Sequence, residues 1–166
     1  LPLVPGLTLR LERGIRVPDV GCGAGRALMR MAATFPASSF TGFDLCEEAI
    51  EMARKEACER GLENVQFEKR DVVRLDEPES FDLVTAFDAI HDQADPAGVL
   101  RAIHRALKVD GVFLMQDIDS SSQLHKNLEN PIGTFLYTIS CMHCMTVSLA
   151  RGGAELGTCW GVELAQ

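Results

Sequence analysis

The sequence predicts an α/β fold, a doubly wound and mostly parallel sheet with helices on both faces. Short apolar runs typical of strands alternate with segments whose apolar residues repeat at helical spacing. Parallel strands require such helical connections, because the chain must return to the same end of the sheet before each new strand. A length of 166 residues fits one domain with a sizeable core.

The first predicted strand covers residues 17–20 and follows a short helical pattern within residues 1–16. A helix is expected from Arg26, and it must stop before Pro36 because proline cannot continue it. The next run, SSFTGFD, predicts a second strand that ends at Asp44. Each of these strands is therefore followed by a point where the chain turns at one edge of the sheet.

The segment CEEAIEMARKEACERG predicts the next helix, with Glu47 and Glu48 in its first turn and Gly61 as its stop. Residues 65–71 alternate as a third strand, and residues 81–88 form a more buried fourth strand.

Asp95 and Pro96 suit the start of another helix. Its expected apolar face is Val99, Leu100, Ile103 and Leu107. The turn KVDGV leads into a fifth strand, residues 111–117, and no convincing strand follows it.

Composition and charge limit the kinds of molecule that the protein is expected to bind. The formal net charge of −8 disfavours nucleic acid, because phosphate contacts need an excess of cationic side chains. The six cysteines are too scattered for a disulfide framework, and no signal peptide is visible, so reduced thiols in the cytoplasm are expected. The cysteines are Cys22, Cys46, Cys58, Cys141, Cys144 and Cys159.

Residues 131–150 contain no Asp, Glu, Lys or Arg, which raises the possibility of a membrane span. Their several hydroxyl groups argue for a buried or lid-forming helix instead. Within this segment CMHC suggests zinc, but on a helix His143 points away from Cys141 and Cys144, and no second pair follows. We therefore predict no metal.

The stretch VPDVGCGAGRAL places Gly21, Gly23 and Gly25 between a strand and a helix. Glycines at this point allow a ligand to approach the backbone, and the N–H groups of the following helix point outward. A tight turn could also need glycine for its geometry alone. The glycines by themselves leave these two explanations open.

Acidic residues favour the ligand-binding explanation. Four predicted strands place an aspartate at the same edge of the sheet: Asp19, Asp44, Asp71 and Asp88. The pattern GxGxG followed by Arg26 lacks the last glycine of a dinucleotide site, and Asp19 would repel a pyrophosphate. The spacing indicates a nucleoside with a cationic amine tail, a description that S-adenosylmethionine meets.

With these motifs in order, the sequence resembles the class I S-adenosylmethionine-dependent methyltransferases, in the small-molecule branch with the general methyltransferase domain, whose fold is Rossmann-like. The matching stretches include DVGCGAGRAL, FTGFDLCEEAIEMAR, VQFEKRDV and FDLVTAFDAIHDQADP. The cofactor-binding residues that the resemblance implies are Asp19, Gly21, Cys22, Gly23, Gly25, Asp44, Leu45, Asp71, Val72 and Phe87.

The resemblance also assigns roles to these residues. The glycine loop and Asp19 would line the methionine moiety, and Asp44 would hold the ribose hydroxyls. Asp71 would receive the adenine amino group, with Val72 beside the ring. Phe87 and Asp88 would form the floor where the methyl group is presented.

Methyl transfer depends mainly on alignment, and it needs a base only when the acceptor arrives protonated. Asp88 and His91 are the catalytic candidates, with Asp92 beside them after the fourth strand. His91 could instead cap its loop or pack against the later helix. The acceptor itself is expected to be a small molecule, covered by Phe135, Tyr137, Met142 and Met145.

The chain departs from the family at Pro18, in the turn KVDGV before the fifth strand, and at both ends. Pro18 interrupts a central strand, where it removes a hydrogen-bond donor. The family's N-terminal helical region is expected to be reduced to residues 1–16, before a core of residues 17–120 and a helical lid of residues 121–166. Its C-terminal antiparallel hairpin is expected to be missing, so the chain is expected to be truncated at both ends. The sheet edge thereby exposed would favour homo-oligomers.

Three functions stay open on the sequence. The first is methyl transfer to a small molecule, with no membrane partner. The second is an S-adenosylmethionine-binding module without catalysis. The third is an NAD-dependent reductase, which the absent GxGxxG pattern and Asp19 disfavour.

Overall fold

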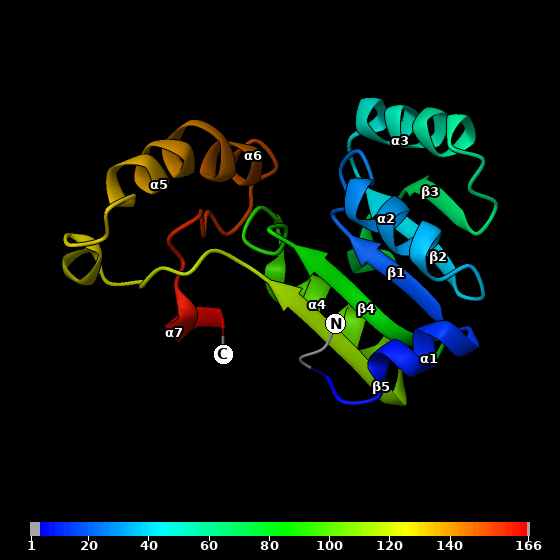
Figure 1. The fold of residues 1–166 in the computed structure, drawn as a ribbon. Helices are drawn as coiled ribbons and strands as arrows, with labels where there is room; N and C mark the ends of the chain where they lie inside the picture. The colour runs from blue at the N-terminus through cyan, green and yellow to red at the C-terminus, as the bar shows by residue number, and fades with distance from the viewer. Residues whose placement is uncertain (1–3, 166) are drawn as a thin grey trace. The chain divides into compact units, whose positions relative to one another are not determined.

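The structure, a computed structural model, describes residues 4–165. Figure 1 shows a sheet whose five strands lie in the order β3-β2-β1-β4-β5. The strands are β1 (Arg16–Val20), β2 (Ser39–Asp44), β3 (Val65–Lys69), β4 (Phe81–Phe87) and β5 (Leu107–Gln116). This arrangement confirms the predicted Rossmann-like α/β fold.

The strands β1, β2, β3 and β4 pair in parallel. In the central strand, Asp19 lies opposite Gly42 of β2 and opposite Thr85 of β4. Pro18 occupies this strand opposite Thr41, so the proline is accommodated within the parallel register. The register brings the ends of β1 and β2 to one edge, as the sequence predicts.

The first helices are α1 (Leu7–Arg13), α2 (Arg26–Thr34) and α3 (Glu47–Glu59), followed later by α4 (Pro96–Ala106). In Figure 1, α2 and α3 lie in front of the sheet and α4 lies behind it. Helix α2 follows Gly25 and stops before Pro36, and α3 carries Glu47 and Glu48 in its first turn, where the helix dipole favours them.

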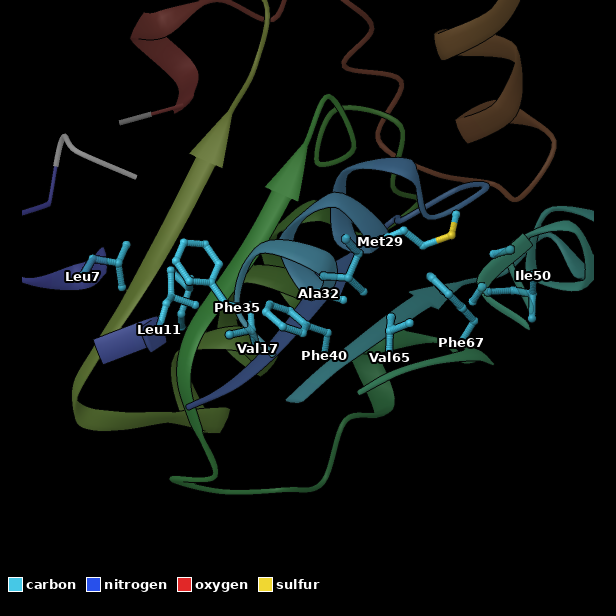
Figure 2. Close-up of a cluster of buried hydrophobic side chains, with 14 residues drawn as sticks. Leu7, Leu11, Val17, Met29, Ala32, Phe35, Phe40, Ile50, Val65 and Phe67 are labelled. Carbon is cyan, nitrogen blue, oxygen red and sulfur yellow. The ribbon is translucent and has the colours of Figure 1, made fainter. Parts of the chain in front are cut away.

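The hydrophobic core lies between α1, α2, α3 and the sheet (Figure 2). Leu7 and Leu11 of α1 are completely buried in it, together with Phe40 of β2 and Leu83 of β4. Fully burying a side chain of this size contributes about 1.5–3 kcal/mol relative to leaving it exposed. Leu7 and Leu11 therefore make α1 part of the hydrophobic core.

The chain forms two compact units. The first comprises the chain up to Phe87 together with residues 101–115, and the second comprises residues 88–100 together with the chain after Met115. This division differs from the boundaries expected after residues 16 and 120. It groups α1 with the sheet, and it groups the loop after β4 with the C-terminal segment.

The strand β5 begins at Leu107, so the prediction of a turn at KVDGV before a strand at 111 is wrong. Leu107 therefore does not extend the apolar face of α4. Two contacts hold this polar stretch in the sheet: Lys108 Nζ lies 2.9 Å from Asp82 Oδ1, and the Arg10 guanidinium donates to the Asp110 carbonyl at 3.0 Å. Both partners are distant in sequence, which explains why local composition indicated a turn.

The second unit carries the short helices α5 (Gly133–Ile139), α6 (Met145–Leu149) and α7 (Val162–Ala165). A π-helical turn, Ser140–Cys144, joins α5 to α6. Among residues 4–165, no helix has the length and apolar character needed to cross a membrane. Of the expected lid side chains, Phe135 and Met142 are exposed, whereas Tyr137 is half-buried and receives a hydrogen bond from Asn127 at 3.0 Å.

Candidate cofactor site

The glycine loop between β1 and α2 has the backbone geometry of a ligand-binding turn. The φ angles of Gly21, Gly23 and Gly25 are 68°, 53° and 72°, in the left-handed region that side chains disfavour. The N–H groups of Gly21 and Cys22 both donate to the Phe43 carbonyl, at 2.9 and 3.1 Å. These bonds attach the loop to the end of β2.

Gly23 and Gly25 are glycines for different reasons. A Cβ at Gly25 would overlap the Phe67 ring, so packing alone excludes a side chain there. A Cβ at Gly23 would meet nothing within 4 Å, so the space in front of this residue is open. The two explanations left open by the sequence therefore apply to different glycines, and Gly23 is the one that faces free space.

Asp19 is the most unusual charged residue of the first unit. Its side chain is buried at 2% exposure, and its Oδ1 accepts a hydrogen bond from Thr85 Oγ1 at 2.7 Å. Burial raises the pKa of Asp19 to about 7; the Thr85 hydrogen bond opposes this shift and the nearby Asp44 carboxylate adds to it. A carboxylate in such a place is stabilised by a cation.

Asp44 is fixed against the loop by two backbone groups. Its Oδ2 accepts from the Gly23 N–H at 2.8 Å, and its Oδ1 accepts from the Cys46 N–H at 2.9 Å. The side chain is only half-buried, so the carboxylate keeps acceptor capacity for further hydroxyl donors. Leu45, also half-buried, follows it in the same turn.

Cys22 lies in the loop between the two carboxylates. Burial raises the pKa of its thiol, and the charges of Asp19 and Asp44 raise it further. The thiol therefore stays protonated and is not a nucleophile. Its place in the loop fits packing beside a ligand rather than chemistry.

Asp71 lies next to the end of β2, because the Arg70 N–H donates to the Asp44 carbonyl at 2.9 Å. Strand β3 ends at Lys69, two residues earlier than expected. Asp71 instead caps the short 3₁₀ helix of residues 72–74, with its Oδ1 accepting from the Val73 N–H at 3.1 Å. Val72, the next residue, is buried.

Phe87 at the end of β4 is half-buried and borders an apolar pocket of about 350 Å³. Ala27 and Met31 of α2 line the same pocket, as does Leu114 of β5. Ala27 is the second residue of α2, and the lining follows this helix as far as Phe35. Its volume is at the small end of the range for ligand pockets.

The remaining candidates lie in the second unit. Asp88 is exposed, and its φ of 50° is strained for a residue with a side chain. Gln116 Nε2 donates to its Oδ1 at 3.1 Å. Strain of this kind gathers at functional sites, where surrounding structure maintains it.

His91, by contrast, is 2% exposed, and both of its ring nitrogens face carboxylates. Nδ1 lies 2.8 Å from Asp117 Oδ1, and Nε2 lies 3.3 Å from Asp92 Oδ1. Burial lowers its pKa, but the hydrogen bond and charge of Asp117, with Asp92 and Asp88, outweigh it and leave the pKa raised. The imidazole of His91 is therefore not a free base exposed to solvent.

Sequence reasoning overlooked Asp117 and Cys144. Asp117 follows β5 directly, so the strand-end rule that selected the other aspartates would have found it. Cys144 was considered only with Cys141 and His143, but it is buried whereas both of those are exposed. The π-helical turn changes which side chains share a face, and no local pattern predicted that turn.

A parallel sheet with a glycine loop after β1 and carboxylates at the strand ends defines a nucleoside-cofactor-binding domain. The family model described as "Methyltransferase domain" matches residues 11–150. The chain therefore belongs to this family, the class I S-adenosylmethionine-dependent methyltransferases.

Individual relatives agree. The ubiquinone biosynthesis O-methyltransferase of Neisseria meningitidis serogroup C is 34% identical over 118 residues, which cover 70% of this chain and 49% of the relative. The chain thus spans about half the length of the curated relatives it matches. Relatives of this kind confirm the predicted methyltransferase family.

Solved structures give the same class. The crystal structure of the YcgJ protein from Bacillus subtilis has a TM-score of 0.63 and 31% identity, covering 81% of this chain and 54% of that one. PKMT2 from Rickettsia typhi, solved in complex with AdoHcy, has a TM-score of 0.54 and 26% identity, covering 62% of this chain and 20% of that one.

Proposed function

We propose that this chain binds S-adenosylmethionine and belongs to an enzyme that methylates a hydroxyl group of a small, mainly apolar molecule. The observation that carries the proposal is Asp19, a carboxylate that lies at 2% exposure just before the glycine loop and whose pKa is raised by burial to about 7. The ammonium group of a methionine tail would stabilise the ionised form of this carboxylate. The residues present therefore fit the cofactor that the family uses.

The other residues of the loop fit the rest of the cofactor. Gly21, Cys22, Gly23 and Gly25 present backbone to the methionine moiety, with open space at Gly23. The Asp44 carboxylate, held by two N–H groups, accepts hydrogen bonds from the ribose hydroxyls. The half-buried Leu45 follows it in the same turn.

The adenine ring is expected beside Val72. The carboxylate of Asp71 is half-exposed and can accept from the adenine amino group while it caps its 3₁₀ helix. This position follows from β3 running beside β2, which brings Asp71 next to the ribose-binding Asp44.

The acceptor class rests on two supports. The curated relative from Neisseria is named an O-methyltransferase of ubiquinone biosynthesis, which makes a phenolic hydroxyl the first acceptor to test. The apolar pocket at Phe87 and Ala27 has the size of a small aromatic ring with substituents. Phe87 would exclude water from the face where the acceptor lies.

The cofactor supplies a sulfonium methyl group, so the protein needs to align the acceptor and to receive its proton. Asp88 is exposed and held by Gln116, so its carboxylate is the more accessible of the two catalytic candidates for taking that proton. His91 as a base stays a prediction, because its Nδ1 is engaged by Asp117 and its ring is buried.

Calorimetric titration with S-adenosylhomocysteine tests the proposal, with NAD as the control ligand. Micromolar binding of S-adenosylhomocysteine and no binding of NAD would support the assigned site. Binding of NAD alone would overturn it in favour of a reductase. Transfer of a radiolabelled methyl group to a panel of phenols then separates a methyltransferase from a cofactor-binding module without catalysis.

A further inference from the structure

A second cluster of polar side chains is formed entirely by residues of the second unit. His91 and Asp92 come from the loop after β4, and Cys144 comes from the end of the π-helical turn. One ligand atom from each of the three residues lies within 4.8 Å of the other two. Nitrogen, oxygen and sulfur donors of this kind are the protein ligands of zinc.

The contact between His91 and Asp92 is unusual. His91 Nε2 lies 3.3 Å from Asp92 Oδ1, and within residues 4–165 this buried oxygen meets the full geometry of a hydrogen bond with no donor, although the Cys144 thiol also reaches the Asp92 side chain. Two ligands at about 2.0–2.1 Å from one zinc ion in a tetrahedron stand about 3.3 Å apart. The two atoms therefore have the separation of neighbouring ligands without the geometry of a hydrogen bond.

Asp117 sets the protonation of the imidazole. Its side chain is 8% exposed, and its Oδ1 lies 2.8 Å from His91 Nδ1. Because a carboxylate only accepts, this contact places a proton on Nδ1, so Nε2, the nitrogen that faces Asp92, is the one that can bind a metal ion. Histidine ligands of metals commonly have such a carboxylate partner behind them.

The π-helical turn provides the third donor. Cys144 is 4% exposed, whereas Cys141 and His143 of the same turn are exposed to solvent. The Cys144 thiol also hydrogen-bonds to the Asp92 side chain. A divalent cation bound there would take the place of the proton of the thiol.

We infer that His91, Asp92 and Cys144 form a binding site for one zinc ion, oriented by Asp117 and separate from the proposed cofactor residues. A thiolate and a carboxylate balance the two charges of the ion, and the neutral imidazole completes three protein ligands. A water molecule takes the fourth position of the tetrahedron. The longest of the three ligand separations shortens when the ion binds.

The ion would fasten the loop after β4 to the helical segment of residues 133–149. Without the ion, weaker contacts join the loop to the helical segment, such as the hydrogen bond that Ser148 Oγ donates to the Gln93 carbonyl at 3.2 Å. The inference does not depend on the proposed methyl transfer. It replaces the sequence-based expectation that CMHC binds no metal with a site that uses only the last residue of that motif.

The test uses the whole chain, freed of metal by a chelator and then titrated with Zn²⁺ or Co²⁺. We expect one ion per chain and, with Co²⁺, the near-ultraviolet charge-transfer band of a cobalt–thiolate bond. Cys144→Ser should abolish that band and weaken Zn²⁺ binding by at least about a hundredfold. Asp92→Asn should weaken it at least about tenfold, and Asp117→Asn should do so about 10–100-fold, as expected for loss of a carboxylate behind a histidine ligand.

Cys141→Ser and His143→Gln are the matched controls, because these residues belong to the same turn but are exposed. Both should bind Zn²⁺ as the parent chain does. The inference is overturned if the parent chain takes up no stoichiometric ion, or if Cys144→Ser keeps the cobalt band. It is also overturned if the control variants lose binding, since the site would then be the exposed part of CMHC. Circular dichroism of each variant separates loss of binding from loss of folding.

Discussion

Each unit of the molecule buries a cluster of polar side chains near the end of a strand, and the two clusters differ in charge. In the first unit Asp19 is a buried acid whose near partner is the neutral hydroxyl of Thr85. In the second, His91 is a buried base that faces Asp92 and Asp117. Burial dominates the pKa of Asp19, whereas neighbouring carboxylates overcome burial for His91. The first cluster therefore suits a positively charged ligand, and the second gathers metal-ligating atoms around one point.

The largest expected effect is the pH dependence that Asp19 gives to stability. Its pKa is about 7 in the folded chain and about 4 when unfolded, so folding favours the protonated form. The stability that it contributes is therefore fully present below about pH 4 and is lost as the pH rises through about 7. The difference of about three between the two pKa values corresponds to about 4 kcal/mol in the free energy of unfolding. Urea unfolding at several pH values measures this loss.

Asp19→Asn is the control, because asparagine keeps the shape and the contact with Thr85 but does not ionise. Its free energy of unfolding should lose the part of the pH dependence that lies between about 4 and 7. If the parent and the variant show the same pH dependence over that range, the raised pKa of Asp19 is wrong.

The second effect concerns ligand binding at the same residue. Asp19→Asn should weaken S-adenosylhomocysteine binding by about a hundredfold, because it removes the charged partner of the ammonium group. For the parent chain, affinity should rise with pH up to about 7, as Asp19 ionises. Calorimetry at pH 5.5 and 8 measures both. A variant that binds like the parent would remove Asp19 from the site.

Asp44→Ala should have a smaller but clear effect. It removes a half-buried carboxylate that accepts from the Gly23 and Cys46 N–H groups and, in our proposal, from the ribose. We expect a loss of cofactor affinity of more than tenfold, measured by the same titration. Glu63→Ala, which changes a carboxylate outside the proposed site, serves as control. Unchanged affinity of Asp44→Ala would show that the motif assignment is wrong.

The smallest effect is expected at the exposed face of the second unit. Cys141→Ala should change the free energy of unfolding by less than about 0.5 kcal/mol, because surface substitutions of this kind remove few contacts. Thermal unfolding compares it with Cys144→Ala, whose side chain is buried and which should be clearly less stable. Equal losses would mean that the two cysteines do not differ in burial as described.

Most of the fold could be predicted because its signals are local. Glycine, proline and the periods of apolar residues mark the ends of β1, α2, β2 and α3 within one or two residues. The start of β5 could not be predicted, because Lys108 and Asp110 are held in the sheet by Asp82 and Arg10, far away in sequence. The polar residues of KVDGV indicated a turn, but their contacts with Asp82 and Arg10 keep this stretch in β5.

In the candidate cofactor site, too, some features could be predicted from local signals and others depend on long-range contacts. Parallel strands bring their ends to one edge, so Asp19, Asp44 and Asp71 could be named from order alone. What separates Gly23 from Gly25 is the Phe67 ring, which reaches Gly25 from β3 and leaves Gly23 open. The sequence marks both glycines alike, since the backbone needs a left-handed turn at each.

By itself, then, the sequence determined the class of the fold, the family and the strand-end acids, because each depends on residue type and spacing along the chain. Only the tertiary structure decided which of these acids is buried, which strand Lys108 belongs to and that His91 meets Asp117 and Cys144. Those outcomes depend on contacts between residues that are far apart in sequence. Burial and long-range pairing set the charge state of Asp19 and of His91, and with it what each cluster can bind.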